Sequence, residues 1–455
     1  MRRLLLLTSA LFLLAGVSAT AATVNVVRGA GFGHGIGMSQ YGAYGFALKG
    51  FGHERILAHY YRGTTLARIR AGQQVRVLLQ DSDPYVRVKG ITRGPGNRKL
   101  KPGVTYTARP GSAGRLSLSG GGRRVGSFRS PLRVAGGKRG VRLLGRAQNG
   151  LSSTRYRGAM ELRRGSAGGV TAINVVPVDP YVRGVVAAEM PSSWHPEALK
   201  AQAVAARTYA LATDKPGVFD QYADTRSQVY GGIAAETANT DRAVRATAGR
   251  VVTYDGDLAT TFFFSTSGGR TENVENSFVG SEPQPWLKSV EDPYDRISPK
   301  HRWRFRFTDA QLDARLGAPG RFKRVKVLER GRSPRIVRAR IYGTRGTRVL
   351  SGPSVRAQLG LYDTWAYFST VSTAQVRSRR ARSSANHSPV HEIAGSFTPA
   401  PRSGGLLVEQ RNGHRWVRVS RIATTRKGRY RTTLGVSGTY RVRAGGVAGP
   451  AVRVS

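Results

Sequence analysis

The sequence predicts an α+β protein with a β-rich part, an Ala-rich helix and a small β-sandwich at the C-terminal end. Three observations lead to this prediction. Residues 66–178 contain short runs of alternating apolar and polar residues separated by Gly, Pro and Asn, which is typical of strands and turns. Residues 194–209 form the strongest helical stretch, with many alanines and Pro196 in the first turn. Alternating runs return at even spacing in residues 391–455, which indicates the sandwich.

The other elements follow in chain order from the same signals. Helices are expected over 39–49, 53–61 and 239–247, and either Ser192 or Ser193 is the expected N-cap of the Ala-rich helix. An apolar run from Thr260 ends in a tight Ser-Gly-Gly turn. Residues 369–390 are rich in Ser, Arg and Ala without an apolar period, so we expect a linker there.

The first residues have the pattern of a secretory signal peptide. The chain starts with Met1-Arg2-Arg3, continues with an apolar run, and then offers the small-residue cleavage pattern Ala19-Thr20-Ala21. We therefore expect residues 1–22 to be a leader and the protein to be secreted. The apolar run is shorter than the roughly 20 residues of a bilayer span, and an uncleaved anchor is the alternative.

Composition excludes some chemistries. The chain has no cysteine, so disulfides, thiolate metal sites and a cysteine nucleophile are excluded. Lys and Arg number 73 against 26 Asp and Glu, a net charge of +47 that would concentrate the protein on polyanions. For an exported protein we expect anionic wall polymers as that partner and no nucleic acid. A solvated basic surface is the equally weighted alternative.

Glu189 is the first candidate for catalysis. It lies in the apolar stretch Val185–Met190, directly before the Ala-rich helix. Burial among apolar residues raises the pKa of a carboxyl group and keeps it protonated, which suits a general acid for glycosidic cleavage. An acidic residue placed near a helix N-terminus for the dipole is the alternative.

Other motifs carry weaker signals. His34 stands in a Gly-rich loop, but no other histidine has a metal-ligand spacing to it, so neither a metal nor a cofactor is expected. Ser267-Gly268-Gly269 lacks the G-x-S-x-G pattern of a nucleophile elbow. Gln202 and Tyr209 are seven residues apart on one helix face, where they form either a groove wall or a solvated stripe.

Four blocks together resemble the SpoIID/LytB family, over about residues 28–368, so that 23–368 is the expected domain. The blocks are Gly31–Ala43, Tyr181–Tyr209, Gln228–Gly232 and Phe263–Thr271. The resemblance implies a lytic transglycosylase that acts on peptidoglycan glycan strands, with Glu189 as the catalytic acid. It also implies that the other matching positions line the substrate groove: His34, Ser39, Gln40, Gln202, Arg207, Tyr209, Tyr230, Ser267, Gly268 and Gly269.

The sequence departs from the family pattern in two ways. In many members the Gly-His-Gly block lies at the C-terminal end of the domain, after the Leu-Gly-Leu segment. Here the Gly-His-Gly block lies at the N-terminal end of the domain, and Leu359-Gly360-Leu361 lies at its C-terminal end. We therefore predict a circular permutation. The cysteines that some members use for zinc are absent, so we predict no structural zinc of that kind.

One convincing carboxylate favours a lytic transglycosylase over a hydrolase, which normally needs two. Three alternatives stay open. The chain could enhance a separate cell-wall amidase without catalysis of its own. It could be a muramidase or glucosaminidase with a second carboxylate from Asp179, Asp224, Glu272 or Glu275. It could also be an extracellular binder of nucleic acid or another polyanion, on the ground of charge alone.

Overall fold

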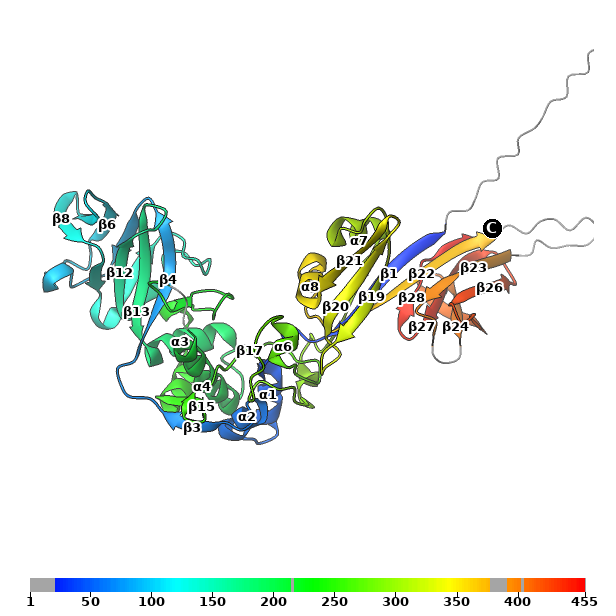
Figure 1. The fold of residues 1–455 in the computed structure, drawn as a ribbon, viewed down its shortest axis with the longest axis horizontal. Coiled ribbons are helices and arrows are strands. Elements are labelled where there is room, and N and C mark those ends of the chain that lie inside the picture. The colour runs from blue at the N-terminus through cyan, green and yellow to red at the C-terminus, as the bar shows by residue number, and fades with distance from the viewer. Residues whose placement is uncertain (1–20, 214–216, 377–390, 402–404, 455) are drawn as a thin grey trace, which may run out of the picture.

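The computed structural model describes residues 21–213, 217–376, 391–401 and 405–454, and it has an α+β fold of several sheets and short helices (Figure 1). Residues 1–20 of the predicted leader lie outside the described part. Within that part, no helix combines the length and apolarity that a bilayer crossing requires.

The predicted β-rich part consists of two sheets. One sheet has the order β14-β4-β13-β12-β9 and the other the order β11-β10-β5-β6-β7-β8. The strands of the first sheet are β4 (Gln74–Asp83), β9 (Leu132–Ala135), β12 (Ala159–Arg164), β13 (Val170–Pro177) and β14 (Gln221–Tyr222). Those of the second sheet are β5 (Val86–Lys89), β6 (Thr105–Pro110), β7 (Arg115–Gly120), β8 (Arg123–Arg129), β10 (Val141–Leu144) and β11 (Arg155–Tyr156).

A helical part adjoins these sheets. Its helices are α1 (Gln40–Leu48), α2 (His53–Tyr60), α3 (Val178–Glu189), α4 (Pro196–Ala212) and α5 (Ala238–Ala246). Four of them confirm the predicted helices, whereas α3 was not predicted as a helix. The predicted cap of α4 was wrong: His195 is the N-cap, and its Nδ1 accepts from the Glu197 amide at 3.3 Å.

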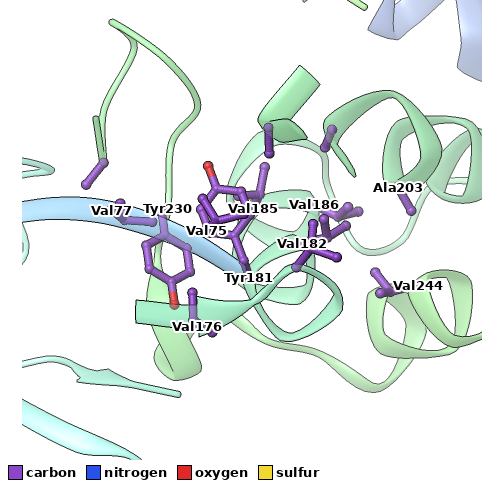
Figure 2. Close-up of a cluster of buried hydrophobic side chains, with 14 of the residues drawn as sticks. Val75, Val77, Val176, Tyr181, Val182, Val185, Val186, Ala203, Tyr230 and Val244 are labelled. Atoms are coloured by element: carbon purple, nitrogen blue, oxygen red, sulfur yellow. The ribbon is translucent and has the colours of Figure 1, made fainter. Parts of the chain in front are cut away.

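The core beneath α3 fixes the position of that helix. Tyr181, Val182, Val185 and Val186 are fully buried and form one face of α3. Figure 2 shows this face together with Ala203 of α4, Val244 of α5, and valines of β4 and β13. Burial of these apolar side chains contributes about 1.5–3 kcal/mol for each large one, so the end of α3, where Glu189 stands, is held firmly.

A third region follows the helical part. It comprises the antiparallel sheet β19-β20-β21 and two helices. Its elements are β18 (Arg302–Phe307), α7 (Asp309–Leu316), β19 (Phe322–Arg330), β20 (Ile336–Gly343), β21 (Gly346–Ser351) and α8 (Gly352–Leu359).

One sheet joins this region to the C-terminal strands, in the order β18-β1-β22-β23-β26. The linker predicted from residue 369 was placed too early, because β22 (Ala366–Val376) continues as a strand; residues 377–390 lie outside the described part. The C-terminal sandwich is therefore not built from residues 391–455 alone. Its strands are β1 (Ala22–Ala30), β22, β23 (His391–Thr398), β24 (Leu406–Asn412), β25 (Arg415–Ile422), β26 (Arg429–Leu434), β27 (Gly438–Ala444), β28 (Val447–Ala448) and β29 (Val452–Val454).

Short elements complete the chain. The strand β3 (Thr65–Arg68), which begins the predicted β-rich part, pairs instead with β15 (Arg250–Tyr254). The remaining elements are β2 (Met38–Ser39), β16 (Asp257–Leu258), β17 (Phe263–Phe264), α6 (Val274–Ser277) and the 3₁₀ turns Pro95–Asn97, Gly137–Arg139, Gly232–Ala235 and Asp295–Ile297.

Candidate active site

Three of the sequence blocks meet at Glu189, the last residue of α3. The backbone amide of Val229 donates to Glu189 Oε1 at 2.8 Å. The side-chain amide of Gln40 lies 3.4 Å from Glu189 Oε2 and 3.3 Å from the Glu189 carbonyl oxygen. Residues separated by 149 and 40 positions along the chain are thus brought to one carboxyl group.

The environment of Glu189 favours its protonated form. Burial raises the pKa of this carboxyl group above its ordinary value, and the hydrogen bonds from Val229 and Gln40 offset part of that effect. The side chain is half-buried, so it keeps access to solvent and to a ligand. The combination is that of a proton donor, as the apolar sequence around Glu189 predicts.

The first and fourth blocks lie side by side. The Met38 amide donates to the Phe262 carbonyl at 3.1 Å, and the Tyr41 amide donates to the Ser265 carbonyl at 3.0 Å. β2 and β17 pair in parallel between these bonds. This pairing positions Gln40 beside Glu189, because Gln40 is the first residue of α1 and directly follows β2.

His34 belongs to the same loop but serves the fold. Its Nδ1 accepts from the Ile36 amide at 3.1 Å, so the proton is on Nε2, which donates to the Phe263 carbonyl at 3.0 Å. Burial, aided by the charge of Arg356, lowers its pKa to about 3. His34 is therefore neutral at physiological pH, and it also lines a cavity of about 470 Å³ with Phe278 and Arg356.

A buried ion pair joins the first and fourth blocks to the end of the domain. The Arg335 guanidinium binds the Asp363 carboxylate with two bonds, at 2.9 and 2.8 Å, and both side chains are buried. Arg335 also donates to the carbonyls of Arg270 at 2.8 Å and Ser267 at 2.9 Å. The Arg335 side chain fills the space beside Gly35, which has a φ of +86° and no room for a Cβ.

Several predicted groove residues are enclosed in the core. Arg207 is 0% exposed, and its guanidinium lies 2.6 Å from Asp179 Oδ1. Tyr230 is fully buried and donates to Asn174 Oδ1 at 2.9 Å. These two side chains are bonded to Asp179 of α3 and Asn174 of β13, and they do not line a groove.

Gln202 and Tyr209 share one face of α4, as their spacing predicts. Gln202 is fully buried, and within the described residues neither atom of its amide has a hydrogen-bond partner. The Tyr209 ring is buried against Phe262, with ring centroids 5.6 Å apart. A buried amide without a partner is unfavourable, so Gln202 lowers the stability of this part of the core, and like Arg207 and Tyr230 it is fully enclosed.

Ser39 and the Ser-Gly-Gly turn have structural roles in this chain. Ser39 caps α1, its hydroxyl accepting from the Gly42 amide at 3.1 Å. The buried Ser267 hydroxyl accepts from the Gly269 amide at 2.9 Å. Gly268 has a φ of +75°, and a Cβ there would lie 2.8 Å from the Cβ of Ala30, so only glycine fits.

Asp292 is a buried acid that no sequence pattern marks as a candidate. It is 0% exposed and lies against Gly42, with the hydroxyls of Tyr60, Ser39 and Ser267 around it. Neither carboxyl oxygen has a well-formed hydrogen bond, and no Lys or Arg pairs with it in the described part of the chain. Burial, and then the charge of Asp295, raise the pKa of Asp292 to about 7.

Replacement of Asp292 by Asn should stabilise the fold above neutral pH. The folded state keeps a proton that the unfolded state releases above pH 3.8, so wild-type stability falls between that value and about pH 7 and then levels off. Asp292→Asn removes this loss. We expect a gain of up to roughly 4 kcal/mol at about pH 8 and little difference at about pH 4. Urea unfolding at both pH values measures this gain in the free energy of unfolding. If Asp292→Asn is destabilised equally at both pH values, Asp292 is not a buried acid that stays protonated up to about pH 7.

The two ends of the domain, from which a circular permutation is predicted, lie side by side. The Ala30 amide donates to the Trp365 carbonyl and the Gly33 amide to the Tyr362 carbonyl, both at 3.1 Å. The Gly-His-Gly loop can therefore reach the site from the start of the chain as well as from the end of the domain. The permutation itself stays a prediction.

Comparison with known proteins identifies similar chains. Residues 166–254 match the family model SpoIID, described as stage II sporulation protein. The chain is 33% identical over 210 residues to stage II sporulation protein D of Bacillus subtilis, which covers 42% of this chain and 60% of the relative. It is 40% identical over 134 residues to an amidase enhancer of the same species, which covers 30% of this chain and 18% of that protein. The chain thus spans less than two thirds of the relatives it matches.

Proposed function

Because this chain is a member of the SpoIID/LytB family, we propose that it acts on the bacterial cell wall as a peptidoglycan lytic transglycosylase. In this proposal it cleaves the bond between N-acetylmuramic acid and N-acetylglucosamine and leaves 1,6-anhydro ends. The observation that carries the proposal is the half-buried Glu189, whose pKa is raised and whose carboxyl group is held by Val229 and Gln40. The activity requires a location outside the cytoplasm, which the leader predicted over residues 1–22 would give.

The proposed reaction needs one acid that also serves as a base. The Val229 amide donates to Oε1 of Glu189 at 2.8 Å, whereas the Gln40 amide is farther from Oε2, at 3.4 Å, so we assign the transferable proton to Oε2. Oε2 gives that proton to the glycosidic oxygen as the bond to muramic C1 breaks. The C6 hydroxyl oxygen then bonds to C1 and returns its proton to Glu189. No water is consumed, and the Val229 amide stabilises the carboxylate formed between the two steps.

The alternative carboxylates of a hydrolase are engaged elsewhere. Asp179 holds Arg207, Asp224 holds Arg226, and Glu275 holds Lys288. Glu272 is fully buried and accepts from the backbone amides of Arg332 and Ser333, both at 2.9 Å. A muramidase or glucosaminidase mechanism would need one of these groups to be free, so the pairing supports the single-acid mechanism.

A cavity with aromatic walls, which Glu189 itself does not line, suits a sugar. Trp194 stacks on Tyr44 with ring centroids 4.6 Å apart and contacts Tyr41 at 4.7 Å. Tyr41 directly follows Gln40, which touches Glu189. Trp194 and Tyr44 line a cavity of about 600 Å³ together with Asn239 and Lys200. Aromatic walls with a few polar groups are a common form of ligand site.

Product mass tests the proposal against its rivals. Purified peptidoglycan, with and without prior amidase treatment, is incubated with the protein and its fragments are weighed. Anhydro ends, one water lighter than hydrolysed ends, support the transglycosylase. Hydrolysed ends would show a muramidase or glucosaminidase. The similarity to an amidase enhancer supports a second candidate function. In that case the protein by itself would release no glycan fragments, but it would accelerate the release of stem peptides by an added amidase.

The pH profile should follow Glu189. The acid form is the active one, so kcat/KM should fall as pH rises through the raised pKa of Glu189, above its ordinary value of 4.5. Gln40→Leu removes an amide that favours the carboxylate, so the falling limb should move to higher pH. The exposed Gln73→Leu is the control and should leave the limb in place. If the falling limb of the pH profile stays at the wild-type position in Gln40→Leu, Glu189 is not the group that titrates there.

A further inference from the structure

Two adjoining cavities at the C-terminal end of the structure share Arg28 and Tyr367 among their lining residues. One has a volume of about 620 Å³ and is also lined by Arg302, Arg304 and Trp365. The other has a volume of about 830 Å³ and is lined by residues of β19 and of the C-terminal strands. Together they form what we name the cationic cleft.

The second cavity adds more cations to the cleft. Arg324, Lys326, Arg330, Arg421 and Arg443 line it. Among the lining residues of the two cavities there is no Asp or Glu. In the described part of the chain, Arg443 alone of the lining cations has a carboxylate within 4.0 Å, that of Glu409 at 3.4 Å. The cleft therefore concentrates positive charge, and Glu409 neutralises only one of its cations, Arg443.

The strand register brings like charges together. Arg28 of β1 stands directly opposite Arg304 of β18, an arrangement that is unfavourable between like charges. Both guanidinium groups come within 4 Å of the position that a Cβ at Gly446 would take, at 3.9 and 3.6 Å. The Nε of Arg28 is buried without a partner. The Arg28 guanidinium already donates through Nη1 to the Gly445 carbonyl, so an anion at this point would relieve the repulsion and satisfy the unpartnered donor, Nε.

The shape of the cationic cleft and its aromatic side chains indicate which class of anion it binds. Two joined cavities with cations along both suit a polymer that carries repeated charges, and a concave cleft does not suit a flat membrane. Nucleic-acid clefts stack bases on free aromatic faces. Here Arg330 lies 4.5 Å over the Tyr367 ring and Arg302 lies 5.8 Å over the Trp365 ring, so these faces already carry cations.

We propose that the cationic cleft binds a linear polyol-phosphate polymer, a chain of phosphodiesters without bases. Guanidinium groups bind phosphate oxygens with paired hydrogen bonds, which suits the arginine-rich lining. The site is separate from Glu189 and does not depend on the proposed catalysis. It would hold the protein on a phosphate-bearing matrix.

The test compares two full-length variants that each lose four exposed charges. The cleft variant carries Arg304→Gln, Arg324→Gln, Lys326→Gln and Arg421→Gln. The control variant carries Arg123→Gln, Arg124→Gln, Arg129→Gln and Lys138→Gln, on the β-rich part. Synthetic poly(glycerol phosphate) is the probe, and binding is measured over a range of salt concentrations around 0.15 M.

We expect the cleft variant to lose about tenfold or more in affinity with a shallower salt dependence, and the control variant to stay within about twofold of wild type. Equal losses in both variants would overturn the proposal, since total charge would then explain binding. Tighter binding of a single-stranded DNA with the same number of phosphates, or of anionic phospholipid vesicles, also overturns it.

Two further measurements keep the result interpretable. The double variant Arg324→Glu and Lys326→Glu, on the exposed edge of β19, should bind more weakly than the corresponding pair of Gln substitutions. Thermal unfolding checks that each variant is folded. Fragment release from purified peptidoglycan should be unchanged in the cleft variant, so a failure of the cleft and a failure of the proposed catalysis give different results.

Discussion

Glu189→Gln should abolish the release of anhydro fragments, the largest effect expected for a single substitution in this chain. The amide can still accept from Val229, but it has no proton to give to the glycosidic oxygen. General acid catalysis contributes about 10²–10⁴-fold, and this residue would also act as the base, so activity should drop below detection. The measurement is mass spectrometry of fragments from purified peptidoglycan, normalised to the amount of folded protein.

The matched control is Glu282→Gln, at an exposed glutamate of a loop. It makes the same chemical change away from the site and should leave fragment release at the wild-type rate. Full activity in Glu189→Gln would remove Glu189 as the acid. Enhancement of an added amidase that survives in Glu189→Gln would point to the second function, in which the chain binds glycan without cleaving it.

Arg335→Met should produce the largest loss of stability. The substitution leaves the buried Asp363 carboxylate unpaired and frees the carbonyls of Arg270 and Ser267. Removal of one partner of a buried ion pair typically costs about 3–5 kcal/mol, which corresponds to a fall in Tm of roughly 10 °C for a domain of this size. Thermal unfolding followed by circular dichroism measures it.

Two further variants separate the ion pair from a general effect of substitution. Arg338→Met removes an arginine whose partner Glu329 lies at the surface, and its effect should stay within about 0.5 kcal/mol. The double variant Arg335→Met, Asp363→Leu removes both buried charges and should recover part of the loss. If the single variant Arg335→Met unfolds at the wild-type temperature, the Arg335–Asp363 ion pair does not stabilise the loops that contain Ser267 and Arg270.

Local signals in the sequence were enough for much of the helical part. Ser39 before α1 and Pro196 with Glu197 in the first turn of α4 mark where these helices begin. Glu189 could be selected because its apolar neighbours already imply a desolvated carboxyl group. The helix α3 was missed because Pro180 lies near its start and the following segment reads equally well as a buried strand.

What the sequence could not give depends on contacts between distant segments. Arg207 has the composition of a surface or groove residue, and only its pairing with Asp179 and the carbonyl of Arg250 explains why it is buried. Asp292 shows no local signal because its enclosure is made by α1 and α2. The C-terminal boundary was misplaced for the same reason, since β22 finds its partner β1 at the other end of the chain.

The central position of β22 bears on how this protein can be divided for study. β22 pairs with β1 on one side and β23 on the other, and Val26 and Val371 from this sheet are buried beneath the C-terminal strands. A chain shortened before β23 would expose an open strand edge and two apolar side chains. Such edges recruit other chains and promote aggregation. The C-terminal strands are thus not a detachable module, and their role is better examined by substitutions within the intact protein.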